Sequence, residues 1–175
     1  MTSTVKIKLR PIKETDTNNI VKWRNNPRVL EHFIYQKQLT KEDHQNWLKT
    51  QVKTKKVFQF IIHHNEDSKD VGCVYLRDVD FKNSKAEFGI FIGEDSARSK
   101  GIGTLATKQI LKFAFNKLNI NKVFLRVFAQ NLNAIASYKK NGFTQEGLFQ
   151  EEAIIGNKKN DLVFMAILKK NWEKK

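Results

Sequence analysis

The sequence has little cysteine, little proline and no long hydrophobic run. It contains 1 Cys and 2 Pro among 175 residues. The lone Cys73 excludes a disulfide within the chain and is typical of a reducing compartment. Apolar runs such as Val57 to Ile62 are far shorter than the roughly 18 residues that a membrane-spanning helix needs. We therefore predict a cytoplasmic protein without a membrane span.

The sequence also lacks the features of an exported protein and those of a disordered one. Met1 to Lys6 is not followed by the apolar stretch of a secretory signal peptide. Apolar residues make up 40% of the chain, with 13 Phe spread along it, and this composition excludes a disordered chain. A length close to that of one ordinary domain predicts that residues 1–175 fold as a single unit.

Acidic residues are scarce relative to basic ones. There are 18 Asp and Glu against 32 Lys and Arg, so the formal net charge is +14. Such a field attracts anions, whether a nucleic acid, a membrane surface or a nucleotide cofactor. The surplus is mostly lysine in scattered pairs, whereas nucleic-acid-binding proteins gather basic and aromatic residues on one face. We expect a solvated, lysine-rich surface and no membrane partner, with nucleic-acid binding as the alternative of a different class.

Patterns for metal binding and for a nucleophilic residue are absent. His63 and His64 are adjacent on an expected strand, so their side chains point to opposite faces and cannot share an ion. Cys73 lies beside Val71 and Val74, which is typical of a buried, unreactive thiol. There is no Gly-x-Ser-x-Gly turn. We expect neither a metal nor a covalent enzyme intermediate.

Periodicity, capping residues and turn residues divide the chain into alternating strands and helices. The expected strands are 6–10, 57–64, 71–79, 86–92, 122–129, 146–155 and 161–168. The expected helices are 17–25, a short one opening at Asn26-Pro27, one after Thr40 that carries Trp47 and Val52, one from Leu105 to Leu118, and 131–140. This order predicts a mixed α/β sheet.

A glycine-rich turn stands between the strand expected at 86–92 and the helix that follows. It reads Arg98-Ser99-Lys100-Gly101-Ile102-Gly103-Thr104. A turn of this kind exposes backbone N–H groups at the positive end of a helix dipole and can hold a phosphate or pyrophosphate. Its glycines allow an anion to approach the backbone without a Cβ in the way.

Other interpretations of this turn are weaker. A dinucleotide-binding fingerprint requires an Asp or Glu about twenty residues further on, but the following strand offers Arg126. A Walker loop needs Gly-Lys followed by Ser or Thr, which is absent. A helix that begins with two glycines for purely structural reasons is the remaining alternative.

Two motifs together resemble a known family. Arg98-x-x-Gly101-x-Gly103, after a strand and before an amphipathic helix, resembles the coenzyme A loop of GNAT N-acetyltransferases. The run from Asn131 to Phe143 resembles the second motif of that superfamily, and the order of elements is similar over nearly the whole chain. The closest likeness is to the bacterial branch that acetylates amino-sugar nucleotides, ribosomal-protein N-termini or spermidine.

The resemblance implies a fold and a cofactor. The fold would be one α/β (α+β) N-acetyltransferase domain over residues 1–175, with a mixed, mostly antiparallel seven-stranded sheet, helices on both faces, and a V-shaped splay between the fourth and fifth strands. The cofactor would be acetyl-CoA, without a metal. The implied cofactor-binding residues are Phe91, Ile92, Gly93, Arg98, Ser99, Lys100, Gly101, Ile102, Gly103, Thr104, Asn131, Asn133 and Tyr138.

The resemblance also implies catalytic residues. Tyr138 matches the family tyrosine that gives a proton or hydrogen bond to the departing thiolate, although a core aromatic is the alternative. Glu87 would accept a proton from the ammonium, directly or through water, or would lie on a solvent-facing edge of the sheet. His32 and His44 are reserve candidates for the base.

The sequence constrains the identity of the acceptor less than it constrains the type of reaction. Trp23, Arg24 and Trp47 resemble residues of the branch that acetylates nucleotide-linked sugars, with Glu87 also facing the acceptor, so we expect an amino-sugar nucleotide. Core packing of both tryptophans is the alternative. The acids Glu146, Glu151 and Glu152 keep a polyamine acceptor open, and a peptide N-terminus is a third option. The partner would be a small-molecule amine, and a homodimer is the expected assembly.

Overall fold

The computed structural model describes residues 5–174, and its centre is a seven-stranded sheet of order β1-β2-β3-β4-β5-β7-β6. The strands are β1 (Ile7–Pro11), β2 (Phe58–His64), β3 (Lys69–Asp80), β4 (Lys85–Ile92), β5 (Lys122–Phe128), β6 (Thr144–Ile155) and β7 (Lys158–Leu168). Every neighbouring pair is antiparallel except β4 and β5, which are parallel. The mixed, mostly antiparallel sheet expected from the sequence is confirmed.

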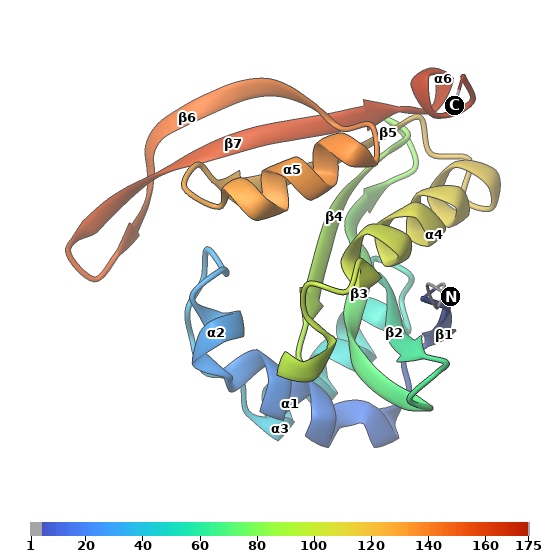
Figure 1. Ribbon diagram of the computed structural model, residues 1–175, viewed down its shortest axis with the longest axis vertical. Helices are drawn as coiled ribbons and strands as arrows, with labels where there is room; N and C mark the ends of the chain where they lie inside the picture. The colour runs from blue at the N-terminus through green and yellow to red at the C-terminus, as the bar shows by residue number, and fades with distance from the viewer. Residues whose placement is uncertain (1–4, 175) are drawn as a thin grey trace.

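The helices cover both faces of the sheet (Figure 1). One face carries α1 (Thr17–Asn25), α2 (Pro27–Leu30) and α3 (Lys41–Trp47), and the other carries α4 (Ile102–Asn116) and α5 (Leu132–Lys140). A last turn, α6 (Lys169–Trp172), follows β7 and was not expected. No helix within residues 5–174 is long and apolar enough to cross a membrane.

The helix expected after Thr40 is shorter than predicted. The Thr40 hydroxyl accepts a hydrogen bond from the Asp43 N–H (3.0 Å) and begins α3, as a capping residue should. The α-helix then ends at Trp47, and the chain continues as a π-helical turn, Leu48–Val52. The expectation of one continuous helix is therefore wrong. The two final strands are also longer at their starts than the sequence predicts.

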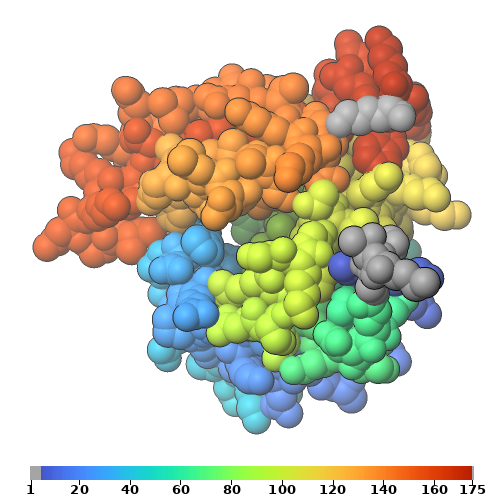
Figure 2. Space-filling model, viewed as in Figure 1, coloured from blue at the N-terminus to red at the C-terminus, as the bar shows by residue number. Residues whose placement is uncertain are grey.

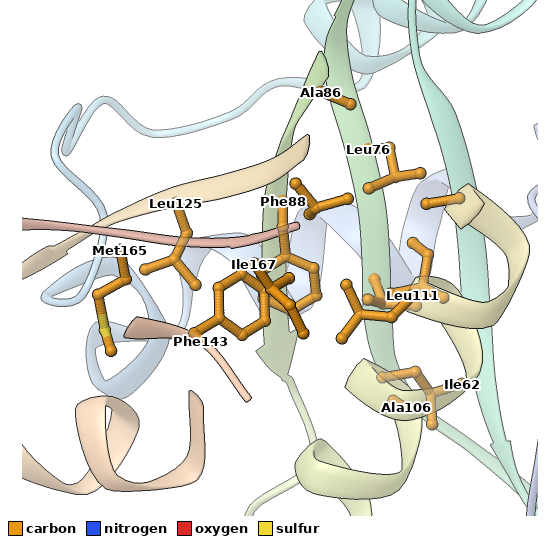
Figure 3. Packing of buried hydrophobic residues seen from close by; sticks show 14 of the residues in the cluster. Ile62, Leu76, Ala86, Phe88, Ala106, Leu111, Leu125, Phe143, Met165 and Ile167 are labelled. Carbon is orange, nitrogen blue, oxygen red and sulfur yellow. The ribbon is translucent and has the colours of Figure 1, made fainter. Parts of the chain in front are cut away.

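The main hydrophobic core lies between the sheet and α4. One face of α4 packs on the strands, and it carries Ala106, Ile110 and Leu111 at helical spacing. Figure 3 shows the side chains of Ala106 and Leu111 with their partners from the strands, which include Ile62, Leu76, Phe88, Leu125 and Met165. The core fixes the position at which α4 begins relative to β4.

A smaller cluster holds the other helices in place. Ile20, Trp23 and Val29 pack against Ile61, Cys73 and Phe91 on the opposite face of the sheet. Successive residues of β4 therefore serve different clusters, because side chains alternate across a strand. The alternation expected from the sequence, with Phe91 on one face and Phe88 on the other, is confirmed.

The sheet opens between β4 and β5. The two strands pair only at Lys85–Lys122, Ala86–Val123 and Glu87–Phe124. Beyond Glu87, β4 stays paired with β3 as far as Ile92, while β5 turns toward β7. The edge of β4 that faces β5 is therefore unpaired over residues 88–92. The V-shaped splay expected between the fourth and fifth strands is confirmed.

Candidate active site

A cleft of about 320 Å³ lies in the wedge between β4 and β5. Residues 87–92 of β4 and 125–127 of β5 form its walls, and the start of α4, α5 and the segment after α2 complete it. Figure 2 shows the surface hollowed between α5, α2 and the yellow-green segment that leads into α4. The cleft therefore contains the unpaired edge of β4.

Two residues of the glycine-rich turn, Arg98 and Gly103, line this cleft. Ser99 and Gly101 adopt left-handed backbone conformations, with φ of 60° and 77°, and Gly101 is the residue that caps α4. A Cβ added at Gly101 or Gly103 would meet no atom within 4 Å. The first N–H groups of α4 have no partners within the helix, so this open approach fits a pyrophosphate.

One contact joins α5 to the start of α4 at this cleft, and another caps α5. The Thr104 and Ser137 hydroxyl oxygens lie 3.1 Å apart and join the start of α4 to α5. The Asn131 side chain accepts a hydrogen bond from the Ala134 N–H (3.2 Å) and caps α5, so its carbonyl oxygen is already engaged. These contacts fix the direction in which Tyr138 projects.

Tyr138 lines the cleft from α5. Its ring packs edge-on against Phe88, with ring centroids 5.8 Å apart, and also contacts Phe143. Its hydroxyl has no hydrogen-bond partner among residues 5–174. Burial raises the pKa of Tyr138 well above its usual value, so the phenol is protonated at neutral pH.

Glu87 lies at the vertex of the wedge, where β4 and β5 part. It is 4% exposed, and Arg77 Nε (3.0 Å) and Arg126 Nε (3.1 Å) donate to its two carboxylate oxygens. Burial alone would raise the pKa of Glu87, but the hydrogen bonds and charges of the two arginines outweigh it and lower the pKa. The carboxylate is therefore held ionised and weakly basic.

The cleft, its glycine turn and its tyrosine are matched by a known family. The profile of the acetyltransferase (GNAT) domain matches residues 6–144. The chain is a GNAT acetyltransferase. As a member of this family it is an acetyl-CoA-dependent N-acetyltransferase that acts on amines.

Relatives of this GNAT acetyltransferase cover most of its length. The spermidine N(1)-acetyltransferase of Escherichia coli is 26% identical over 172 residues, which are 98% of this chain and 91% of that protein. The acetyltransferase PseH of Campylobacter jejuni is 30% identical over 143 residues, which are 79% of this chain and 85% of that protein. A crystal structure of spermidine N-acetyltransferase from Vibrio cholerae, in complex with CoA and spermine, superposes with a TM-score of 0.89 at 23% identity, covering 95% of this chain and 98% of that chain.

A second cavity of about 300 Å³ adjoins the GNAT cleft on the side of α1 and α3. Of the residues expected to contact the acceptor, Arg24 and Trp47 line this cavity, and Glu87 lines the first. The Arg24 guanidinium lies 3.3 Å above the Phe33 ring, and its Nη1 is buried without a hydrogen-bond partner in the described chain. Trp47 Nε1 donates to Gln59 Oε1 (3.0 Å).

Trp23 does not reach either cavity. It is 2% exposed, its Nε1 donates to Glu94 Oε1 (2.7 Å), and a Cβ added at Gly93 would lie 2.1 Å from its ring. The indole belongs to the buried cluster between α1 and the sheet and lines neither cavity, which favours a packing role over stacking on an acceptor. Any side chain at residue 93 would overlap the Trp23 ring, so glycine is required there. Trp23 therefore fits the alternative stated from the sequence, in which it packs in the core.

The other residues expected to bind the cofactor are arranged unevenly. Phe91, Ile92, Arg98, Gly103, Asn131 and Tyr138 line the first cavity, whereas Gly93, Ser99, Lys100, Gly101, Ile102, Thr104 and Asn133 do not. The side chain of Ile102 is 1% exposed in the main core, which leaves only its backbone for a ligand. Arg98 Nε pairs with Asp95 Oδ1 at 3.2 Å. Among the reserve bases, His32 lines the first cavity and His44 the second.

Sequence reasoning missed the arginines of the GNAT cleft. Arg77 and Arg126 come from β3 and β5 and meet only because both strands flank β4. A charged residue in the middle of an apolar strand, as in Val123 to Val127, is the available signal. Tyr75, which packs over Gly89, was also missed, although Gly in a strand indicates a close approach of this kind.

Proposed function

We propose that this enzyme transfers the acetyl group of acetyl-CoA to the amine of an amino-sugar nucleotide, by direct attack within a ternary complex. The observation that carries the proposal is the excess of arginine on the acceptor side of the wedge. The carboxylate of the wedge, Glu87, is shared by Arg77 and Arg126, the adjoining cavity adds one carboxylate, Asp43, and Arg24 forms no ion pair with residues 5–174. An acceptor with a diphosphate suits this field, whereas a polycation is repelled by it.

The cofactor would lie along the unpaired edge of β4. Backbone groups of residues 91–93 would bind its pantetheine arm in the manner of an added strand, and the N–H groups of residues 98–104 would bind its pyrophosphate. Arg98 adds positive charge at that end, and Asn131 lies beside it. When bound, acetyl-CoA supplies an acetyl group already activated as a thioester.

Tyr138 would supply the proton for the leaving thiolate. Its hydroxyl carries a proton at neutral pH and has no competing partner in the described chain, so it is free to donate to a sulfur atom as negative charge develops there. A backbone N–H near Ile92 would stabilise the oxyanion. Neither role requires a covalent enzyme intermediate.

Glu87 is better suited to positioning than to proton transfer. A carboxylate with a lowered pKa is a weak base, and both of its oxygens already accept hydrogen bonds from arginines. Its contacts hold Arg77 and Arg126 side by side at the vertex of the wedge. The amine would then lose its proton to water.

A thiol-release assay tests this function. Purified protein and acetyl-CoA are combined with UDP-linked amino sugars, spermidine or short peptides, and free CoA is measured. We expect turnover to be fastest with an amino-sugar nucleotide. Faster turnover of spermidine or a peptide would overturn the choice of acceptor and leave the acetyltransferase assignment intact.

The polyamine alternative depends on the acids of the β6–β7 hairpin. Two of these acids are already paired, Glu146 with Lys122 (2.5 Å) and Glu151 with Lys159 (2.6 Å). Each of these acids therefore already has a lysine partner with which a polyamine or a cationic peptide N-terminus would compete.

A non-catalytic nucleic-acid-binding role makes a different prediction. It requires affinity that falls steeply with salt and survives Tyr138→Phe, whereas acetyl transfer is lost in that variant. A homodimer and a cytoplasmic location stay predictions from the sequence, to be checked by light scattering of the purified protein and by cell fractionation.

A further inference from the structure

The second cavity contains two polar groups that the fold leaves without partners. It lies between α1, α3 and the sheet, next to the catalytic wedge. Arg24 Nη1 and His44 Nε2 are buried and have no hydrogen-bond partner among residues 5–174. Leaving buried polar groups unpaired costs free energy, so such groups require an explanation.

Arg24 is the more unusual of the two. Its guanidinium makes no hydrogen bond or ion pair with any residue in 5–174, and its one strong contact is the Phe33 ring. Burial lowers the pKa of Arg24, but a guanidinium stays charged at every physiological pH. Arg24 is only partly exposed, and a partly buried positive charge without a counter-ion is unfavourable for the protein. An anion in the cavity would supply the missing partner.

His44 adds a second hydrogen-bonding group at the same cavity. The residue is 2% exposed, and its Nδ1 lies 3.0 Å from the Thr17 hydroxyl oxygen. Burial lowers the pKa of His44, so its ring is neutral at pH 7. In the tautomer in which Nδ1 accepts from the Thr17 hydroxyl, which an anion in the cavity would select, Nε2 carries the proton and is a donor. Arg24 and His44 together therefore favour an oxyanion.

Three of the other polar groups around the cavity are already engaged. Gln59 accepts from Trp47 and donates to Cys73 Sγ (3.1 Å), and Arg77 is bound to Glu87. Asp43 is the one carboxylate of the lining, and it caps α3 by accepting from the Thr40 N–H (3.2 Å). The buried polar atoms of the lining that have no partner within residues 5–174 are thus Arg24 Nη1 and His44 Nε2.

The cavity is connected to the catalytic wedge through shared walls. Phe33, Tyr35, Tyr75, Arg77 and Phe91 line both spaces. A single ligand can therefore extend from the reaction centre at the vertex of the wedge into the second cavity. Trp47, Phe33 and Tyr35 offer flat apolar surfaces for a ring attached to the anion.

We propose that the cavity between α1, α3 and the sheet is an acceptor subsite in which Arg24 and His44 bind an oxyanion of the acceptor, its phosphate group. This inference rests on the proposed function for the identity of the acceptor. It assigns Arg24 as a specificity-determining residue and His44 as its companion.

Binding of UDP to the CoA-saturated protein tests the subsite. Saturation with CoA occupies the glycine-rich turn, so a second nucleotide cannot bind there. By calorimetry we expect UDP to bind, uridine to bind at least tenfold more weakly, Arg24→Gln to weaken UDP binding at least tenfold, and His44→Gln about threefold. Wild-type affinity for UDP in a folded Arg24→Gln variant, or no UDP binding at all, would overturn the subsite.

Two further variants show whether a loss of UDP affinity comes from the contact with Arg24, from the net positive charge of the protein or from misfolding. Lys22→Gln removes one positive charge from the same helix, at a side chain that is 72% exposed, and should bind UDP as the wild type does. Arg24→Lys keeps the charge and should retain UDP affinity within about threefold. Equal losses in Lys22→Gln and Arg24→Gln would reduce the effect to net charge and overturn the proposal. Melting temperature and CoA affinity report on folding.

Turnover distinguishes this inference from the proposed function. If no amino-sugar nucleotide is acetylated but UDP binding still depends on Arg24, the choice of acceptor fails and the oxyanion subsite stands. If amino-sugar nucleotides are acetylated with an unchanged KM in Arg24→Gln, the proposed function stands and the subsite is wrong.

Discussion

At the scale of single residues, the cleft contains a phenol and a carboxylate whose surroundings shift their pKa values in opposite directions. Tyr138 is packed among aromatic rings and keeps its proton, whereas Glu87 is held ionised by two guanidinium groups. Tyr138 is placed to donate a proton, and Glu87 holds the two arginines in position. These surroundings give two predictions that separate the two roles.

Tyr138→Phe should abolish most of the activity without disturbing the fold. The ring contacts with Phe88 and Phe143 stay, and only a hydroxyl without a partner in the described chain is removed. We expect kcat to fall by about 10²-fold, as for loss of a general acid, with the KM for acetyl-CoA nearly unchanged. Thiol release measures the rate, and an unchanged kcat would exclude Tyr138 as the proton donor.

Glu87→Gln should change the rate but not the position of the acidic limb of the pH profile. Since the pKa of Glu87 is lowered, the group is ionised throughout the neutral range and cannot itself produce a limb there. We expect kcat/KM to fall roughly tenfold, because Arg77 and Arg126 lose their common partner. A profile that loses its acidic limb in this variant would identify Glu87 as the base after all.

The residues could be predicted only in part from the sequence. Tyr138 and the glycines follow from their motif, since the motif fixes their place on α5 and at the start of α4. Trp23 could not be placed, because Trp is equally suited to a binding surface and to a core, and only Gly93 beneath its ring decides between them. Arg77 and Arg126 are 49 residues apart in a chain that gives no sign that they meet.

At the scale of elements, the start of α4 is the feature that we propose to position the cofactor. The helix is anchored by Ile102 and Ala106 in the core, while Gly101 and Gly103 leave its first turn open. Stability and binding therefore make different demands on the same turn.

Gly103→Ala should separate those two demands. Residue 103 lies within α4, and an added Cβ would meet no atom of the protein, so the helix should gain about 0.5 kcal/mol of stability. The same methyl group would occupy the cleft, and we expect the KM for acetyl-CoA to rise about tenfold. Urea unfolding and thiol release measure the two effects.

Gly147→Ala is the matched control for that change. Its added Cβ also meets nothing within 4 Å, but it lies on β6, away from the cleft. Its KM for acetyl-CoA should equal that of the wild type. If Gly103→Ala leaves this KM unchanged as well, the pyrophosphate does not lie against α4.

Most elements could be predicted because their local patterns and tertiary roles agree. The helix after Thr40 could not be predicted fully, because its start depends on a local cap whereas its end depends on packing that converts it to a π-helical turn. The early start of β7 likewise depends on pairing with β6, since Lys158 to Asn160 are polar and carry no strand pattern of their own. Such pairing is a property of the folded sheet.

At the scale of the whole molecule, one ion cluster joins the N-terminal strand to the rest of the sheet. Arg10 on β1 donates to Asp16 (2.7 Å) and to Asp70 on β3 (2.6 Å). The side chain of Asp16 is 8% exposed. Burial alone would raise the pKa of Asp16, but hydrogen bonds from Arg10 and from the Lys13 N–H outweigh it and lower the pKa.

Arg10→Met should therefore destabilise the fold in a pH-dependent way. Removing the donor leaves a buried carboxylate unpaired, and we expect a loss of about 2 kcal/mol at pH 7. Since the pKa of Asp16 is lower in the folded state than in the unfolded state, the ion cluster contributes stability above about pH 4, and the contribution is lost as the pH falls through the folded pKa. The wild type and the variant should therefore converge in acid.

Urea unfolding at a series of pH values measures this convergence. Lys8→Met is the control, since it removes a positive charge from an exposed position on the same strand. It should change the free energy of unfolding by less than about 0.5 kcal/mol at every pH. A difference between Arg10→Met and wild type that is constant with pH would show that packing of the arginine stem, rather than the ion cluster, is responsible.

The brief junction between β4 and β5 has a consequence for the life of the protein in the cell. The two parts of the sheet share only three residue pairs, so a ligand lying between them also ties them together. Saturation with a ligand at about 100 times its Kd adds roughly 2.7 kcal/mol to the free energy of unfolding. Resistance to heat and to proteolysis should thus rise and fall with the supply of acetyl-CoA, so that a starved cell would clear this enzyme faster than a well-fed one.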